Sequence, residues 1–305
     1  MKRAVFAMGC LLAGSVFAEA VLTPAQVQAA YRSSEAQLLD RSGAPLQSLR
    51  VDMKVRRLPW VPLADISPAV QQAVLLAEDQ RFMHHGGVDV SALATAAWDN
   101  LFSRKARGAS TITMQLAGQL DADLQAAAGG RSLRQKWDQM RAAQAIEDSW
   151  SKAQIFEAYL NLVSFRGELQ GIASASYSLF GKAPSGLNQT DGIILASLVR
   201  APNAPPATVT RRACALAKEW RMDSSCQLIG QRVQTALQRT ALYADLAPAP
   251  QVAQLLLKQS GVAIRSTLDG PLQRFAQENL RQQLASLRER NVNDGAIIVL
   301  DNRSG

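Results

Sequence analysis

Residues 67–89 read SPAVQQAVLLAEDQRFMHHGGVD, and they combine a helix start with a group of polar side chains. Ser67 followed by Pro68 is typical of a helix N-cap with proline in the first turn. Apolar residues then recur at helical spacing up to Glu78 and Asp79, where the helix meets a Gly-rich turn. A carboxyl group at such a place can be half desolvated, which raises its pKa towards the range of a general acid or base. The alternative is an ordinary solvated helix end.

A second polar stretch, GASTITMQL, occupies residues 108–116 and follows a basic segment, SRKARGA, at 103–109. Ser110 and Thr111 offer hydroxyl and backbone N–H groups at the start of an expected helix, which is an arrangement that binds anions. The Gly-Lys-Ser/Thr ending of a P-loop is absent. The neighbouring basic residues favour a phosphate over a plain N-cap.

The rest of the chain has mostly helical patterns. One helix has its apolar residues at steps of four, three, three and three, namely Leu133, Trp137, Met140, Ala143 and Ile146. Lys136 and Gln139 share a face of that helix, either as a site or as a solvent-facing pair. Further helices are expected over 90–102, from a Ser151/Gln154 capping box to Val163, over 188–200 and over 271–290. The last residues, GAIIVLDNRSG at 295–305, have the pattern of a buried strand with no partner after it.

Composition excludes several classes of protein. The chain has 305 residues, of which 48% are hydrophobic and 19% charged, so it is neither disordered nor a polytopic membrane protein. Two His and three Cys leave no four-ligand zinc set at a recognisable spacing. The net charge of +8 suits a polyanionic partner, or simply marks a basic protein.

The first twenty residues have the pattern of a targeting segment. Lys2 and Arg3 precede an uncharged, mostly apolar run over 4–18, and a small-residue site, Ala18-Glu19-Ala20, follows. This predicts a signal peptide or an uncleaved signal anchor, and export by either route. In an oxidising compartment a disulfide between Cys214 and Cys226 is compatible with the sequence but not compelled by it.

Five stretches follow one another with consistent gaps: EDQRFMHHGGVD, GASTITMQL, the Lys136 helix, KAQIFEAYLN at 152–161 and SLVRAPN at 197–203. Together they resemble the five motifs of the peptidoglycan glycosyltransferase domain, glycosyltransferase family 51, of class A penicillin-binding proteins. The resemblance covers roughly residues 45–205. STLDGPLQ at 266–273 and the final GAIIVLDNRSG resemble the linker and first strand of that family's transpeptidase domain, whose catalytic Lys-Thr-Gly and Ser-Asp-Asn motifs are absent here.

The resemblance implies a mainly α fold. We expect a lysozyme-like glycosyltransferase lobe with a smaller membrane-proximal lobe, followed by a short C-terminal linker and an orphan strand. The expected organisation is a signal peptide or anchor over 1–20, a stalk over 21–44, the glycosyltransferase domain over 45–245, and a linker with the truncated start of a transpeptidase domain over 246–305.

The resemblance also implies a reaction: polymerisation of lipid II, with inversion and release of undecaprenyl pyrophosphate. Carried over by position, Glu78 is the base and Gln139 takes a second catalytic position. Substrate contacts, with structural support in the fourth motif, fall on Asp79, Phe82, His85, Ser110, Thr111, Gln115, Lys136, Asn161 and Arg200. A divalent cation, Mg²⁺ or Mn²⁺, is expected at the pyrophosphate rather than in a fixed protein cage, and no organic cofactor is expected.

Three departures from the family pattern leave alternatives open. Gln139 stands where the third motif has a glutamate, Gln135 replaces an arginine, and Gly118-Gln119 replace a basic residue and an asparagine. Asp138 lies about 100° round the helix from Gln139 and is a poor substitute. A weak or inactive lipid II-binding scaffold is therefore the first alternative, and a lysozyme-like lytic enzyme is the second.

The expected surroundings follow from the export signal and the resemblance. We expect the periplasmic face of the inner membrane, with the chain anchored or peripheral. The expected partners are lipid II, the growing glycan strand, the membrane surface and other cell-wall synthesis proteins. Nucleic acid is excluded as a partner, because export removes it and the basic residues are not interleaved with aromatics.

Overall fold

The computed structural model describes residues 21–91, 110–124, 132–222, 224–239, 249–300 and 302–303. The predicted targeting segment, the basic segment 103–109 and nearly all of the helix expected over 90–102 lie outside these residues. Within the described part of the chain, no helix combines the length and the apolar character that a membrane crossing needs. The described elements are mainly helical, which confirms the expected fold class.

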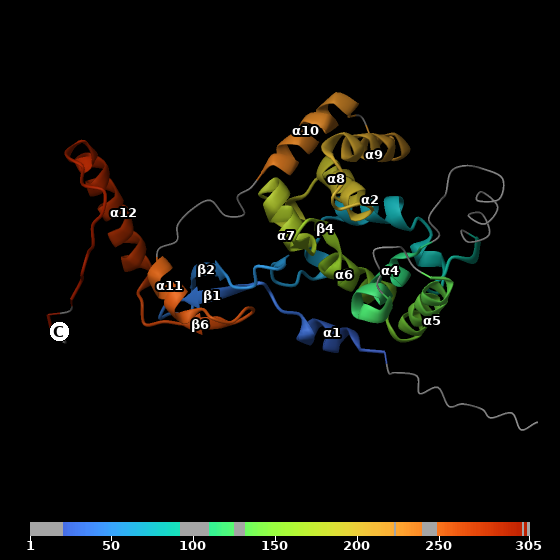
Figure 1. Ribbon diagram of the computed structural model, residues 1–305, viewed down its shortest axis with the longest axis horizontal. Coiled ribbons are helices and arrows are strands. Elements are labelled where there is room, and N and C mark those ends of the chain that lie inside the picture. Colours follow the sequence, from blue (N-terminus) through green and yellow to red (C-terminus); the bar gives the residue numbers. More distant parts are fainter. Residues whose placement is uncertain are drawn as a thin grey trace, which may run out of the picture.

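A helical body is built round helix α8 (Gln189–Val199), which packs against α2 (Pro68–Glu78) and α9 (Pro206–Glu219) (Figure 1). Every residue of α8 from Asp191 onward is buried, as expected for a helix that is apolar on all sides. Gly192 allows the close contact with α2, because a Cβ there would lie 3.0 Å from the Ala69 carbonyl oxygen. The N-terminal half of α2 is thus fixed against the centre of the core.

A second group of helices lies beside this centre. Helix α4 (Ile112–Leu120) packs against both α5 (Leu133–Ser149) and α6 (Lys152–Leu162). The Ser151/Gln154 capping box of α6 is present as predicted, and Ser67 caps α2 through the Ala69 N–H. The expected apolar face of α5 is wrong at its N-terminal end.

The buried stripe of α5 runs through Gln139, Ala143 and Ile146, whereas the Trp137 side chain is 61% exposed. These three buried positions are separated by four and three residues, so they follow one helical face. Trp137 lies about 200° round the helix from Gln139. An apolar face drawn through Trp137 therefore excludes Gln139, although Gln139 is the side chain that is buried.

Helix α10 (Cys226–Gln238) packs against α9, and a disulfide between Cys214 and Cys226 joins the two. Helix α7 (Ile172–Ala175) continues into a π-helical turn over Ser176–Phe180. The short 3-10 segments of the body are Leu63–Asp65, Phe82–His84, Ala122–Leu124 and Pro184–Gly186.

A small three-stranded sheet connects the segment before α2 with the segment after α6. Strand β5 (Leu169–Gln170) lies between β3 (Arg56–Arg57), to which it is parallel, and β4 (Ser164–Arg166), to which it is antiparallel. Close by, Glu157 of α6 accepts hydrogen bonds from Trp60 Nε1 at 2.8 Å and from the Leu63 N–H at 2.7 Å.

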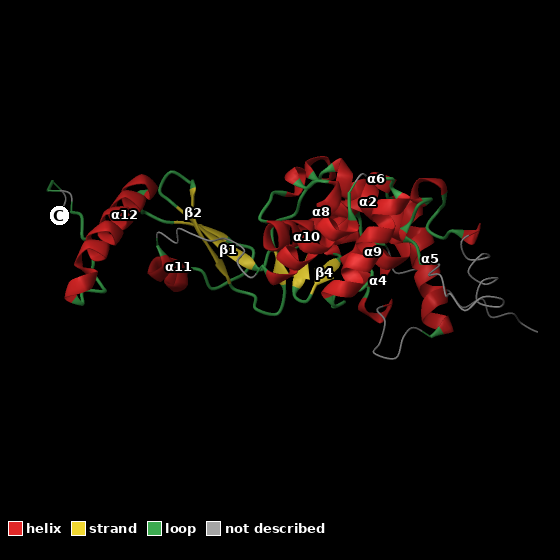
Figure 2. Ribbon diagram, turned by 90° about the horizontal axis from the view of Figure 1, so that it is seen from above, coloured by secondary structure: helices red, strands yellow, loops and turns green. Residues whose placement is uncertain are grey.

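A separate module lies beside the helical body (Figure 2). Its central strand β1 (Glu35–Leu39) pairs antiparallel with β2 (Pro45–Arg50) and parallel with β6 (Ala263–Arg265). Helix α11 (Pro250–Leu256) covers this sheet. The core of the module consists of Ala36, Leu38, Leu46, Ala249, Ala253 and Leu257.

Two expectations for the ends of the chain are corrected. The stalk expected over 21–44 contains helix α1 (Pro24–Ala30) and strand β1, and the linker contains α11, β6 and a 3-10 turn over Arg288–Arg290. The linker also contains α12 (Gly270–Leu287), which confirms the helix expected over 271–290. The orphan strand does not form: residues 292–300 carry no strand, and the Ile298 side chain is 83% exposed. A strand needs a neighbour for its backbone groups, and none of the described segments supplies one.

Candidate active site

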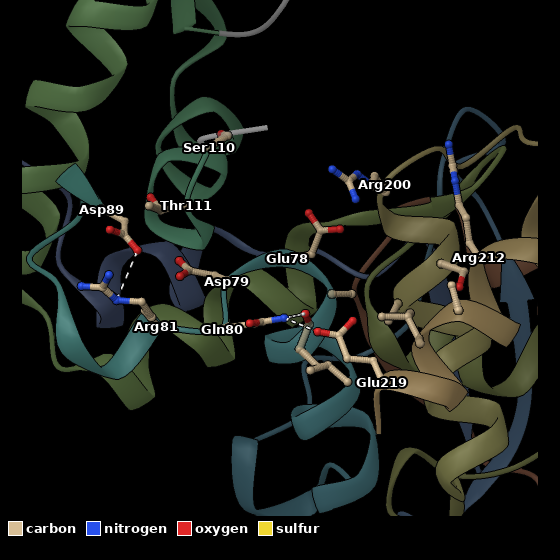
Figure 3. Close-up of a pocket in the computed structure, with 16 residues that line it drawn as sticks. Glu78, Asp79, Gln80, Arg81, Asp89, Ser110, Thr111, Arg200, Arg212 and Glu219 are labelled. Carbon is tan, nitrogen blue, oxygen red and sulfur yellow. Dashed lines mark hydrogen bonds and ion pairs between the residues drawn. The ribbon is translucent and has the colours of Figure 1, made fainter. Parts of the chain in front are cut away.

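A cavity of about 620 Å³ opens where the C-terminal end of α2, the N-terminal end of α4, the end of α8 and the side of α9 meet (Figure 3). Charged groups of both signs and small polar groups line it. The lining residues are Leu76, Ala77, Glu78, Asp79, Gln80, Arg81, Asp89, Ser110, Thr111, Ala196, Ser197, Arg200, Arg212, Ala215, Leu216 and Glu219.

Glu78, the last residue of α2, presents one carboxylate oxygen that has no hydrogen-bond partner among the described residues. Its Oε1 is buried and unpartnered, whereas its Oε2 accepts a hydrogen bond from Gln115 Nε2 at 2.9 Å. Burial raises the pKa of the Glu78 carboxyl above its ordinary value, the Gln115 hydrogen bond and the charges of Arg200 and Arg212 oppose this rise, and Asp79 adds to it. Such a carboxylate is suited to accept a proton.

Asp79, the next residue, has a different role because its carboxylate is fully engaged. It accepts hydrogen bonds from His85 Nε2 at 2.9 and 3.0 Å and from the Ile112 N–H at 3.0 Å. The Ile112 N–H belongs to the first turn of α4, so the helix N-terminus expected to bind a ligand anion binds this carboxylate instead. Asp79 therefore joins the first two sequence motifs.

Thr111 and Ser110 also differ in the hydrogen bonds that their hydroxyl groups form. Thr111 Oγ1 donates to the Gly87 carbonyl oxygen at 2.6 Å and accepts from the Met114 N–H, so the threonine is a helix cap. Ser110 Oγ is buried and lacks a hydrogen-bond partner within the described part of the chain. The serine is thus the hydroxyl that remains available to a ligand in the cavity.

Two arginines lie on the wall of the cavity opposite α4. Arg200 caps the C-terminal end of α8, and Figure 3 shows its guanidinium beside the Glu78 carboxylate. Arg212, on α9, has a buried Nη1 for which the described residues provide no hydrogen-bond partner. Arg200 was predicted from the fifth motif, but Arg212 was missed, since a basic residue on an amphipathic helix gives no signal of its own.

The comparisons with known proteins follow the same stretch of chain. A family profile described as Transglycosylase matches residues 42–222, which is more than half of the chain. The chain belongs to this transglycosylase family. It is 34% identical to penicillin-binding protein 1C of Escherichia coli over 269 residues, which cover 86% of this chain and 34% of that protein.

Two further matches either cover less of this chain or have a lower sequence identity. A biosynthetic peptidoglycan transglycosylase of Mannheimia succiniciproducens is 35% identical over 167 residues, covering 55% of this chain and 66% of that protein. Penicillin-binding protein 1A of Haemophilus influenzae, a solved structure, is 15% identical with a TM-score of 0.33, covering 90% of this chain and 33% of that one. The chain thus spans about a third of penicillin-binding protein 1C, and the family assignment rests on the sequence matches.

Several residues that the transglycosylase motifs singled out lie outside the cavity. Phe82 is buried against Phe156, and His85 faces Asp79 rather than the opening. Gln115 lies behind Glu78 and contacts its carboxylate, so it acts on the proposed base rather than lining the cavity. Lys136 is exposed on the first turn of α5 and does not line the cavity.

The catalytic role expected of Gln139 and the substrate contact expected of Asn161 are corrected, because both side chains are buried in packing interfaces. Gln139 is 1% exposed and donates from Nε2 to the Met114 carbonyl oxygen at 2.6 Å, between α5 and α4. It therefore does not share a functional face with Lys136. Asn161 accepts from the Val61 N–H at 2.9 Å and donates to the Val61 carbonyl oxygen at 2.8 Å. This agrees with the structural support expected of the fourth motif, not with a substrate contact.

A partly buried ion pair that the sequence did not indicate supports the first motif of the transglycosylase. Lys152 Nζ lies 2.7 Å from Glu147 Oε1, donates to the His85 carbonyl oxygen at 2.6 Å, and lies 4.4 Å from the centre of the Phe82 ring. Glu147 also accepts from Thr113 Oγ1 at 2.6 Å. Lys152 thus holds the turn after α2.

A fixed metal site was not expected, and the described residues contain no group of three or more His, Cys, Asp or Glu side chains placed to hold a metal ion. Of the carboxylates in the cavity, Asp79 is committed to His85 and α4, and Asp89 lies 3.7 Å from Arg81.

Proposed function

We propose that this chain is a peptidoglycan glycosyltransferase that polymerises lipid II into glycan strands. The observation that carries the proposal is the buried Oε1 of Glu78, which has no hydrogen-bond partner among the described residues. Its cavity also presents two arginines and the Ser110 hydroxyl, which likewise lacks a partner in that part of the chain. A general base needs an oxygen that is free to approach the reacting hydroxyl, and a leaving phosphate needs cations. The family assignment supports this reaction class.

In the proposed reaction, the 4-hydroxyl of the GlcNAc of one lipid-linked disaccharide attacks the anomeric carbon of the growing chain. Glu78 Oε1 takes the hydroxyl proton as the new C–O bond forms. The bond from the anomeric carbon to the pyrophosphate oxygen breaks, and undecaprenyl pyrophosphate leaves with the electron pair. The configuration at the anomeric carbon inverts, because attack and departure occur on opposite faces.

The two arginines would stabilise the negative charge that develops on the departing pyrophosphate. A divalent cation, Mg²⁺ or Mn²⁺, would bind to the pyrophosphate oxygens themselves, and no step is assigned to a metal held by the protein. Hard cations of this kind commonly keep substrate phosphates and water as ligands.

The scaffold alternative rested in part on the carboxamides of the third motif, and the geometry weakens that part of it. Gln139 is buried between helices and does not line the cavity, and Gln135 forms the capping box of α5 with Ser132. Neither carboxamide therefore removes a charge from the cavity described here. Glu78, Arg200 and Arg212 remain for the chemistry.

Export to the periplasmic face of the inner membrane belongs to the same proposal, as do binding to the membrane surface and to other cell-wall synthesis proteins. Lipid II and its product strand are lipid-linked, so the cavity must work close to a membrane. The basic surface suits an anionic membrane face.

Product analysis tests the proposal and separates it from the hydrolase alternative. The purified chain is incubated with labelled lipid II in detergent with a divalent cation, and the products are separated by size. Glycan strands with released undecaprenyl pyrophosphate are the expected products. Shortening of preformed glycan strands in a parallel incubation, without strand formation from lipid II, would show a lytic enzyme, and unchanged but bound lipid II would show a scaffold.

A further inference from the structure

We infer that Tyr159 is a positioning residue that fixes the orientation of the Gln115 amide and, through it, the Glu78 carboxylate. The inference rests on the proposed function in one respect, namely that Glu78 is the base. Tyr159 lies within the fourth motif, at 152–161, but none of the site roles carried over from the motifs falls on it.

The three side chains form a relay that links three helices. Tyr159 of α6 is fully buried, and its hydroxyl donates to Gln115 Oε1 at 3.0 Å. Gln115 of α4 donates from Nε2 to Glu78 Oε2 at 2.9 Å, at the end of α2. The relay lies behind the carboxylate, since neither Tyr159 nor Gln115 lines the cavity.

The direction of the relay follows from the chemistry of an amide, which has an acceptor at one end and donors at the other. A tyrosine hydroxyl that donates to Gln115 Oε1 turns the NH₂ group towards Glu78. The flipped amide would place an oxygen against a carboxylate, which is repulsive. A phenylalanine at position 159 would remove the donor that stabilises the productive orientation.

The tyrosine remains a donor throughout the working pH range. Burial raises the pKa of the Tyr159 hydroxyl well above its ordinary value, and the negative charges of Glu78 and Asp79 raise it further. An ionised tyrosine would accept hydrogen bonds and release the amide. The surroundings that raise this pKa therefore keep the relay in one state.

The consequence for the base is that its two oxygens differ. Oε2 is held by Gln115, and Oε1 is the unpartnered oxygen. The charged or titratable groups that act on Glu78 are Asp79 on its own turn, Tyr159 on α6, Arg200 at the end of α8 and Arg212 on α9. Replacement of Tyr159 by phenylalanine leaves every charge in place, so a change in Glu78 titration would report the relay.

The experiment compares Tyr159→Phe with Tyr31→Phe in the full chain. Tyr31 is a matched control: it is a largely buried tyrosine whose hydroxyl donates to the Leu58 carbonyl oxygen at 2.6 Å, and it takes no part in the relay. The Glu78 carboxyl is titrated by NMR with ¹³C-labelled glutamate, using Glu78→Gln to assign its signal. The acid limb of the pH profile of lipid II polymerisation is measured alongside.

In Tyr159→Phe the Glu78 midpoint should move up by about one pH unit, because the carboxylate loses a reliable donor. The acid limb of the rate should move up by the same amount, with recovery at high pH, while Tyr31→Phe titrates like wild type. An unchanged midpoint, or a rate loss that is equal at all pH values, would overturn the inference and leave Tyr159 a packing residue.

A second variant keeps the inference open to test if Tyr159→Phe does not fold. Gln115→Leu removes the donor itself while Tyr159 stays in place, and it should raise the Glu78 midpoint at least as far. An unchanged midpoint in Gln115→Leu would overturn the relay. Failure of the proposed function is distinguishable, because wild type would then make no glycan strands while the titration shift would still be measurable.

Discussion

At the residue scale, the adjacent carboxylates Glu78 and Asp79 have different roles because their hydrogen bonds differ. Glu78 keeps one oxygen unpartnered among the described residues, whereas Asp79 accepts from the His85 ring and the Ile112 N–H. A sequence pattern that contains both residues cannot tell them apart, since the difference depends on which way each side chain leaves the end of α2. Both residues line the cavity, and Glu78, whose Oε1 has no partner among the described residues, is the one proposed as the base.

Asp79→Asn should lower the free energy of unfolding by about 1–3 kcal/mol, because an uncharged amide weakens the charge-assisted bonds to the histidine and to the helix N-terminus. Urea denaturation followed by circular dichroism measures the change. Asp294→Asn, at an exposed position, is the control and should unfold like wild type. Equal midpoints for both variants would mean that Asp79 does not hold α4.

Glu78→Gln should stabilise the protein at neutral and higher pH. Burial raises the folded-state pKa of Glu78, so above that pKa the fold contains a charge that it disfavours, and the unfolded chain ionises more easily. The gain should shrink as the pH falls through the folded pKa, where Glu78 becomes protonated and resembles the amide. Melting temperatures of the two proteins across the pH range check this, and a gain that grows towards low pH would contradict it.

At the element scale, the turn after α2 depends on a glycine that faces backbone. Gly87 has a φ of +84°, and a Cβ there would lie 2.7 Å from the Ala143 carbonyl oxygen of α5. Gly87→Ala should therefore cost at least about 2 kcal/mol of unfolding free energy, through strain at a positive φ and displacement of α5.

Its neighbour provides the control for this measurement. A Cβ at Gly86 would meet nothing within 4 Å, and its φ lies outside the left-handed region. Gly86→Ala should change the unfolding free energy by less than about 0.5 kcal/mol. Similar losses in the two variants, measured by urea denaturation, would show that the close approach to α5 is not what makes Gly87 necessary.

The disulfide between α9 and α10 gives a further prediction. It closes a loop with a sequence separation of 12 between Cys214 and Cys226. Replacing both cysteines by serine should lower the unfolding free energy by about 3 kcal/mol, as the open chain gains entropy in the unfolded state. Thermal unfolding with and without reductant checks this: reduction should lower the melting temperature of wild type but not of the double variant.

Helix starts were predictable because their signals are local. Ser67, Ser151 and the proline after Ser67 act where the sequence places them. The inner face of α5 was not predictable by hydrophobicity, because the buried residue is Gln139 and the exposed one is Trp137. The burial of the Gln139 amide is compensated by a hydrogen bond from its Nε2 to the Met114 carbonyl oxygen. This acceptor lies near Gln139 only because α4 packs against α5.

At the scale of the whole molecule, long-range pairing explains what sequence reasoning missed. The pairing of β1 with β6 joins residues 37–39 to 263–265, and no local pattern indicates such a contact. Through this pairing, the segments predicted as a stalk and a linker fold together as one module. Likewise Tyr159, Gln115 and Glu78 come from three helices, and Arg212 comes from a fourth, so only the fold brings them to one site.

The motifs located the cavity but did not assign every residue to it. The predicted residues that line it are Glu78, Asp79, Ser110, Thr111 and Arg200. The others do not line it and contact neighbouring parts of the body instead: Phe82, His85, Gln115, Gln139 and Asn161. Sequence spacing places residues along an element, but it does not decide which side chain turns into a cavity and which turns into the core. That decision depends on helix packing.

The most direct test of the account is the rate of glycan strand formation by Glu78→Gln, measured together with the affinity for lipid II. The account predicts that lipid II binding stays within a few-fold of wild type while the rate falls by at least about 100-fold, since the base is lost and the cations remain. Glu278→Gln, on the exposed face of α12, is the matched control and should polymerise like wild type. Strand formation by Glu78→Gln at the wild-type rate would contradict the account, because the proton would then have another acceptor.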